Sequence, residues 1–330
     1  MDDYVEERPP LTKRVVNIKR RTLLNSVPDA RPGIGAAEQI DAWTNRKVEP
    51  CIPTGITALD EAIGGLPVKQ ITAVLADTGV GKSELCRQIG RRAARKGHAV
   101  IHVDRELGQS RIVTRQVAQD TEIPSYVFAD EQPTFSQEQL VRYRKMQKAY
   151  ARKWKHYSLY IPPLGIALSD LTKKLDLELA AIATEKPSVI ILDSLQRFAE
   201  GVPVADIRVQ VQTTMRWAEG FVRERNVALI IPSEVSRPSD NKKRKGISAG
   251  AESRAIEFTS DVVLYLEERF QGPRDAERIP EGTTVERRVS VTIEKARDGA
   301  RGTLPDDLVF IEPHWDMKTR KAPPPKKKEK

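Results

Sequence analysis

The sequence predicts an α/β protein with a mostly parallel, twisted sheet flanked by helices. Three observations support this class. The apolar run QITAVLA (70–76) passes through a glycine-containing loop into a helix-forming segment. Two further apolar runs, HAVIHV (98–103) and VIILD (189–193), lead into acidic residues. Buried strands that feed loops and helices in this way are typical of open α/β sheets.

Composition sets the outer limits. The chain has 330 residues, a net charge of +9 and 39% hydrophobic residues, so a packed core is expected. The positive charge favours an anionic partner such as nucleic acid, although basic surfaces also serve solubility. The two cysteines lack the spacing of a disulfide framework or zinc site, which fits a reducing compartment. With no apolar signal or membrane-spanning stretch, we expect a cytoplasmic protein.

Charge divides the chain into three parts. We expect residues 1–50 to form a basic, largely disordered arm, in which KRVVNIKRR (13–21) carries five positive charges. We expect residues 51–315 to form the ordered domain and 316–330 to form a basic, disordered tail. Such ends either add salt-sensitive attraction to phosphates or are simply solvated.

The stretch ADTGVGKSE (76–84) nearly matches the phosphate-binding pattern G-x-x-x-x-G-K-[ST], with Ala76 in place of the first glycine. It follows a strand and opens a helix that ends near Gly97. Glycines let backbone N–H groups approach phosphate, the lysine adds a cation, and the serine offers a hydroxyl to Mg²⁺. The predicted nucleotide-binding residues of this phosphate loop are Thr78, Gly79, Val80, Gly81, Lys82, Ser83 and Glu84.

Acidic residues at strand ends complete the predicted site. Asp193 ends the VIILD run, where its carboxylate would hold Mg²⁺ together with Ser83; the alternative is an ordinary turn aspartate. Glu106 lies just past the HAVIHV strand, where it would orient and deprotonate an attacking water. Asp104 competes with Glu106 for this role.

Four segments, in order, resemble the motor domain of DnaB-type replicative helicases, within the RecA-like ATPases. They are PTGITALDEAIGGL (53–66), HVDREL (102–107), VIILDSLQRF (189–198) and IEKARDGARGT (293–303). Several bacterial members of this family also begin the phosphate loop with alanine. The resemblance covers about residues 53–312 and implies a RecA-like three-layer fold.

The resemblance also assigns roles to residues. It places Glu106 on the catalytic glutamate and Asp193 on the metal-associated aspartate. It makes Arg297 an arginine finger with Lys295 as its companion, both reaching the γ-phosphate of a neighbouring subunit. Read without the family, Lys295 and Arg297 are surface charges on a strand.

The implied function is an Mg²⁺-dependent ATP hydrolase that acts as a helicase or translocase on single-stranded DNA in replication. The implied assembly is a hexameric homo-oligomeric ring at the nucleoid, with primase or a loader as further partners and no membrane association. Two alternatives stay open: a recombinase that coats DNA as a filament, and a non-motor ATPase that serves as a loader or scaffold.

Two departures from the family stand out. Glu234, in LIIPSEVSR (229–237), replaces a glutamine that senses the γ-phosphate, and an ionised glutamate donates no hydrogen bond. It would instead bind the attacking water or the metal, or pair with a basic residue. In addition, only about 50 residues precede the motor, too few for the family's N-terminal helical domain. AAEQIDAW (36–43) is then either a linker helix that docks on a neighbour or a helix packed on its own domain.

Basic residues after Glu234 are the predicted DNA contacts, because the family's loops here line the central channel. The alternative is a solvated surface loop. Another channel candidate is RFAEGVP (197–203). The predicted nucleic-acid residues are Arg197, Arg237, Lys242, Lys243, Arg244 and Lys245.

Residues 139–160 combine aromatic and basic residues. One interpretation is a base-stacking platform. We favour an amphipathic helix packed on the sheet, because Leu140, Tyr143, Tyr150, Trp154 and Tyr157 share one helical face.

Overall fold

The computed structural model describes residues 35–45, 51–129, 132–182, 184–234, 251–269, 285–312 and 316–321. The chain divides into two units, Met1–Val48 and Glu49–Lys330. The first contains helix α2 (Ala36–Thr44), which matches the helix expected at 36–43. The second contains every other element named below. The rest of the N-terminal arm, residues 235–250 and residues 322–330 lie outside the described part.

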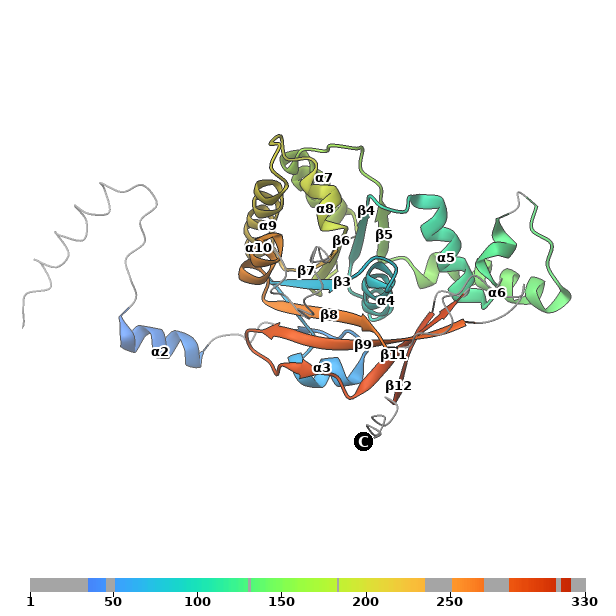
Figure 1. Ribbon diagram of the computed structural model, residues 1–330, viewed down its shortest axis with the longest axis horizontal. Helices are drawn as coiled ribbons and strands as arrows, with labels where there is room; N and C mark the ends of the chain where they lie inside the picture. Colours follow the sequence, from blue (N-terminus) through green and yellow to red (C-terminus); the bar gives the residue numbers. More distant parts are fainter. Residues whose placement is uncertain are drawn as a thin grey trace, which may run out of the picture. The chain divides into compact units, whose positions relative to one another are not determined.

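A ten-stranded sheet forms the centre of the second unit (Figure 1). Its order is β12-β11-β9-β8-β3-β7-β6-β4-β5, and β10 pairs with β9. Six neighbouring strands are parallel: β5 (Tyr157–Tyr160), β4 (Val100–Asp104), β6 (Ser188–Asp193), β7 (Val227–Glu234), β3 (Ile71–Ala76) and β8 (Val262–Glu268). The other strands pair antiparallel: β9 (Val285–Ala296), β10 (Gly302–Thr303), β11 (Asp306–Glu312) and β12 (Asp316–Lys321). The predicted fold class, mostly parallel α/β, is confirmed.

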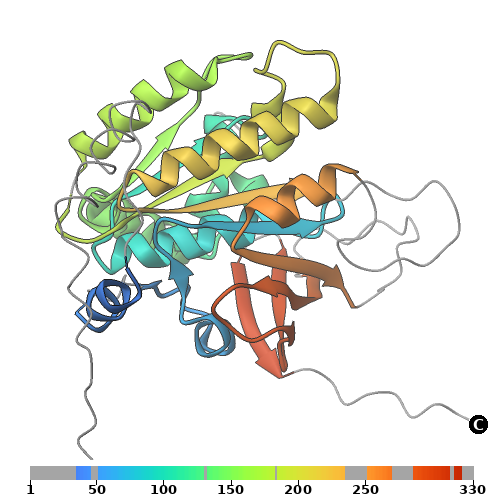
Figure 2. The ribbon, with the colours of Figure 1, turned by 90° about the vertical axis from the view of Figure 1, so that its left-hand side faces the viewer.

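Helices cover both faces of this sheet (Figures 1 and 2). One hydrophobic core joins the sheet to α3 (Thr57–Ile63), α4 (Lys82–Arg95) and the small sheet of β1 (Cys51–Ile52) and β2 (Leu66–Pro67). The other joins it to α7 (Leu168–Ala181), α8 (Leu195–Ala199), α9 (Ile207–Arg223) and α10 (Ala251–Thr259). All six residues of β3 are buried, because alternate side chains enter the two cores.

Helix α4 lies close against the sheet at Gly90. A Cβ atom placed there would come within 2.7 Å of Ile191 Cδ1 and 3.2 Å of Val100 Cγ1. A glycine at this helix position therefore sets the depth at which α4 packs on β4 and β6. The helix predicted between the phosphate loop and Gly97 is confirmed.

The prediction for residues 139–160 is wrong in its extent and its packing. Helix α6 (Gln137–Lys153) begins with a capping box formed by Ser136 and Gln139 and ends before Trp154. Tyr157 and Tyr160 lie instead in β5, at the sheet edge. All of α6 is described, and no residue in it is buried; it contacts α5 (Gln109–Thr121) rather than the sheet. The alternating run YSLY favours a strand, and the helical spacing continued past the true helix end by coincidence.

The predicted start of the C-terminal tail also moves. Residues 316–321, placed in the tail from their charge, form β12 and pair antiparallel with β11, from Asp306↔Lys321 to Ile311↔Asp316. Backbone pairing to an edge strand thus outweighs the basic composition here. Within the described residues, no helix is both long enough and apolar enough to cross a membrane.

Candidate functional site

The phosphate loop connects the carboxyl end of β3 to the first turn of α4. Gly79 and Gly81 adopt φ angles of 84° and 108°, in the left-handed region that favours glycine. Ala76 is the last residue of β3 and is fully buried. The first-glycine position is therefore part of an ordinary strand in this chain, where alanine fits without strain.

Three side-chain contacts hold the loop in place. Lys82, which is buried, donates from Nζ to the carbonyl oxygen of Asp77 at 3.2 Å. Ser83 Oγ donates to Asp193 Oδ1 at 3.0 Å, and Thr78 Oγ1 donates to Glu234 Oε1 at 3.0 Å. The loop is thus tied to the ends of β6 and β7, the two strands that supply Asp193 and Glu234.

A pocket of about 310 Å³ opens over this loop. Arg287, from β9, donates from NH1 to the carbonyl oxygen of Gly79 at 2.8 Å, and its guanidinium lies 4.7 Å from the centre of the Phe310 ring. Sequence reasoning missed both residues, because no local pattern shows that β9 and β11 fold back toward the loop. The pocket is lined by Thr78, Gly79, Gly81, Lys82, Ser83, Glu84, Glu106, Leu107, Arg115, Arg287 and Phe310.

The oxygen atoms beside Lys82 are suitable ligands for a magnesium ion. Asp193 is 1% exposed, and its Oδ1 accepts from Ser83 while its Oδ2 has no hydrogen-bond partner among the described residues. Carboxylate and hydroxyl oxygens are hard ligands of the kind that Mg²⁺ uses together with nucleotide phosphates. The residues present therefore fit the predicted metal.

The two candidate bases occupy different environments. Asp104 is fully buried, and its Oδ1 accepts backbone N–H groups from Glu106, Leu107 and Gly108 at 3.0–3.2 Å. This carboxylate shapes the segment that carries Glu106. Glu106 lines the pocket and keeps solvent contact. Partial desolvation raises the pKa of Glu106, Asp193 raises it further, and Lys82 opposes both effects. The geometry favours Glu106 over Asp104 as the base.

A buried histidine lies behind the metal ligands. His102, on β4, is 2% exposed, and its Nε2 lies 3.9 Å from Asp193 Oδ2. Its Nδ1 shares a 2.9 Å hydrogen bond with the hydroxyl of Tyr157. No local pattern in the sequence indicates this arrangement, since it joins three strands that are distant along the chain.

Glu234 joins the phosphate loop to α8. Its side chain accepts from Thr78, and its backbone N–H donates to Gln196 Oε1 at 3.4 Å. Gln196 Nε2 donates to Ser233 Oγ at 2.9 Å. The structure thus places Glu234 against the loop itself.

Lys295 and Arg297 lie near the amino-terminal ends of β3 and β8, away from the strand ends that carry the phosphate loop. Arg297 NH1 pairs with Asp261 Oδ1 at 2.9 Å, and Asp261 Oδ2 accepts from the N–H of Ile71, the first residue of β3. Lys295 Nζ donates to the carbonyl oxygen of Glu257 at 2.5 Å. Since the phosphate loop follows the last residue of β3, neither side chain joins the loop of its own chain.

The predicted DNA contacts are only partly described. Arg197, in α8, is exposed and forms a 3.0 Å ion pair with Glu200. Arg237, Lys242, Lys243, Arg244 and Lys245 lie outside the described residues.

Comparisons with known proteins identify relatives that share most of this chain's length. DNA repair protein RadA of Mycobacterium tuberculosis is 28% identical over 243 residues, which cover 72% of this chain and 39% of RadA. Replicative DNA helicase DnaB of Leifsonia xyli is 24% identical over 264 residues, or 77% of this chain and 53% of that protein. The chain therefore spans about half or less of the length of these relatives.

Solved structures show the same RecA-like fold. One solved ATPase domain superposes with a TM-score of 0.70 at 18% identity, over 87% of this chain and 99% of that one. A DnaB-like replicative helicase, described with its interactions with primase, gives 0.70 at 17% identity, over 92% of this chain and 71% of that one. The sequence model of the DnaB-like helicase C terminal domain matches residues 51–314. With four-fifths of its residues inside that match, the chain belongs to the family of DnaB-like helicase C-terminal domains.

Proposed function

We propose that this chain hydrolyses Mg-ATP and uses the energy to move along single-stranded DNA, as a helicase or translocase in replication. The main support for this proposal is the arrangement of the site. The phosphate loop is hydrogen-bonded to the ends of β6 and β7, and Glu106 lines the same pocket. Such a site holds a nucleotide and presents a carboxylate to water.

Each residue has a distinct role in the proposal. Lys82 contacts the β- and γ-phosphates, and Ser83 and Asp193 would hold Mg²⁺, which supplies charge neutralisation at the phosphates. Glu106 accepts a proton from the attacking water. Thr78, Gly79, Val80, Gly81 and Glu84 complete the loop around the phosphates.

Glu234 is the proposed link between nucleotide and DNA. It is bonded to Thr78 of the phosphate loop, and the chain continues directly from it into the basic segment 235–250. A phosphate that displaced the Thr78 hydroxyl would alter the position of the Glu234 carboxylate. In this proposal Arg197 and the basic residues 237 and 242–245 contact the DNA backbone.

We further propose that the chain works as a homo-oligomeric ring, most simply a hexamer, at the nucleoid. Arg297 and Lys295 lie near the amino-terminal ends of β3 and β8, whereas their own phosphate loop follows the other end of β3, so a role at a nucleotide requires a second copy. The similar DnaB-like replicative helicase interacts with primase, and we propose primase or a loader as partners here.

The test is ATP turnover with and without single-stranded DNA, followed by unwinding of a forked substrate. We expect DNA to stimulate turnover and the fork to be unwound. Lys82→Ala should abolish turnover with the fold intact by circular dichroism, while Lys96→Ala, at the exposed far end of the same helix, should retain it. Unchanged turnover in Lys82→Ala would defeat the assignment.

A second candidate function is a DNA repair or recombination ATPase, favoured by the 28% identity to RadA. Such a protein would bind single-stranded DNA in proportion to its length, with stimulated turnover and no unwinding. A turnover rate indifferent to DNA would instead favour a loader or scaffold.

A further inference from the structure

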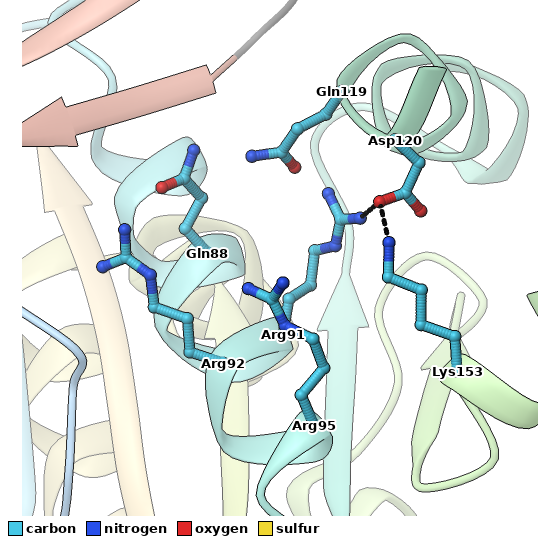
Figure 3. A pocket seen from close by; sticks show the side chains of 7 residues that line it. All are labelled: Gln88, Arg91, Arg92, Arg95, Gln119, Asp120 and Lys153. Atoms are coloured by element: carbon cyan, nitrogen blue, oxygen red, sulfur yellow. Dashed lines mark hydrogen bonds and ion pairs between the residues drawn. The ribbon is translucent and has the colours of Figure 1, made fainter. Parts of the chain in front are cut away.

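A second pocket, of about 250 Å³, lies beside the C-terminal half of α4 (Figure 3). Helix α4 forms one wall, α5 the opposite wall, and the last residue of α6 closes one side. Every described residue that lines this basic pocket is polar or charged: Gln88, Arg91, Arg92, Arg95, Gln119, Asp120 and Lys153.

The basic pocket contains four cationic side chains and one carboxylate. Asp120 already has three partners: its Oδ1 accepts from Arg91 at 2.5 Å and Lys153 at 2.6 Å, and its Oδ2 accepts from Trp154 Nε1 at 3.1 Å. Figure 3 shows the guanidinium of Arg95 on the side of α4 that lines this pocket. One carboxylate leaves an excess of positive charge in the pocket.

Arg91 supplies a second, independent observation. The residue is 4% exposed, and its Nε and NH1 have no hydrogen-bond partner within the described part of the chain. One face of its guanidinium is covered by the Trp154 ring at 4.3 Å. Burial and the nearby charge of Arg87 lower the pKa of Arg91 to about 10. Buried guanidinium donors without acceptors are costly, and an oxyanion would satisfy them.

The helix dipole does not account for Arg91. Arg92 and Arg95 lie in the last turn of α4, where cations complement the helix dipole. That effect explains surface charges, but it does not require a buried, partly unpaired guanidinium. The basic pocket is also separate from the phosphate loop, because nine residues from Lys82 to Arg91 correspond to roughly 14 Å of helix.

We propose that the basic pocket binds a compact, multiply charged phosphate group. The guanidinium groups match phosphate oxygens in geometry and charge. The Trp154 ring, with Arg91 and Lys153 over it at 4.3 and 4.9 Å, is not open for stacking, so the pocket selects the phosphate and not a nucleobase. The phosphate comes either from a free compound or from a nucleic-acid backbone.

Isothermal titration of the full chain with pyrophosphate tests this site. The Lys82→Ala background removes the phosphate loop's lysine, so the result is independent of the proposed ATPase activity. We expect saturable binding there, weakened at least about tenfold by Arg95→Gln plus Lys153→Gln. Lys148→Gln removes one positive charge from the exposed face of α6, as Arg95→Gln removes one at the pocket; it is the control and should bind as its parent does. Arg95→Gln alone keeps every contact to Asp120. If the double variant misfolds, this single variant takes its place and should also weaken pyrophosphate binding.

A titration with oligo-dT in the same background identifies the source of the phosphate. If the double variant weakens oligo-dT and pyrophosphate to the same degree, the ligand is a backbone phosphate. If only pyrophosphate is affected, the ligand is a free phosphate compound. Absence of binding in the Lys82→Ala chain, or equal pyrophosphate binding by the double variant and the Lys148→Gln control, would overturn the proposal.

Discussion

Arg297 is the residue whose proposed role depends most directly on a second copy of the chain. Its guanidinium is bonded to Asp261, which in turn accepts from the N–H of Ile71 at the start of β3. The phosphate loop follows the other end of β3, and six residues of strand span about 20 Å. A side chain at the first end therefore does not reach the γ-phosphate held at the second.

Replacement of Arg297 by alanine should remove the positive charge that stabilises the transition state in a neighbouring site. Arginine fingers contribute about 10³–10⁵ in turnover, so a loss of about a thousandfold or more is expected. The same change removes the ion pair to Asp261, whose side chain is 11% exposed, and should lower the free energy of unfolding by about 1–3 kcal/mol. A thermal melt separates that loss of stability from the loss of turnover.

A mixing assay distinguishes action on a neighbour from action within one chain. Lys82→Ala lacks a working phosphate loop but keeps Arg297, and Arg297→Ala has the reverse defect. In a ring assembled from equal amounts, a site is intact when an Arg297→Ala chain supplies the loop and a Lys82→Ala chain supplies the finger. With random assembly, the probability that a site has both an intact loop and an intact finger is about one-half times one-half. Turnover should therefore recover to about a quarter of the unmodified level if sites act independently.

Two results would contradict this role of Arg297. If the two inactive variants exchange subunits and the mixture stays inactive, then Arg297 does not complete a neighbour's site. Substantial turnover by Arg297→Ala alone would lead to the same conclusion. Subunit exchange is checked separately with chains that carry two different fluorescent labels.

Three further predictions concern single side chains. Because the pKa of Glu106 is raised, turnover should fall as pH decreases through a value above the ordinary 4.5, and a pH–rate profile at the ordinary value would contradict its role as base. Glu234→Gln keeps an acceptor for Thr78 and gains a donor, so DNA stimulation of turnover should rise; complete loss of turnover would show that the ionised carboxylate is required. Gly90→Ala forces a Cβ to within 2.7 Å of Ile191 and should lower the free energy of unfolding by about 1–2 kcal/mol, measured by urea denaturation, whereas Gly220→Ala in α9, with open space at the Cβ position, should raise it slightly.

The strands and the phosphate loop were predictable because their signals are local. QITAVLA and VIILD are continuous apolar runs, and the structure has them as β3 and β6, buried on both faces. The loop pattern also indicates where the backbone requires glycine, since Gly79 and Gly81 adopt positive φ angles. A parallel sheet then brings the carboxyl ends of its strands to one edge, which is why Glu106 and Asp193 could be expected near Lys82.

Other parts depend on contacts between distant segments. Arg287 reaches the phosphate loop across 208 residues of sequence, and His102 meets Tyr157 only because β4 and β5 are neighbours in the sheet. The predicted end of α6 was wrong because a local pattern was misleading: a helical spacing of aromatic residues continued past the helix into β5. Sequence periodicity does not show where hydrogen bonding to a neighbouring strand takes over.

The alanine at the start of the phosphate loop follows from the same sheet geometry. Ala76 pairs with Glu234 in the ladder between β3 and β7, and its methyl group lies in the core shared with α4. The residues that need left-handed φ angles come later, at Gly79 and Gly81, so a methyl group at 76 obstructs no phosphate contact. Because Thr78 is bonded to the side chain of that same Glu234, the entry to the loop and the end of β7 are joined twice, once by register and once by a hydrogen bond. A rearrangement of the loop on binding phosphate would therefore act first on Glu234, and the replacement of the family's glutamine there is more consequential than the missing glycine.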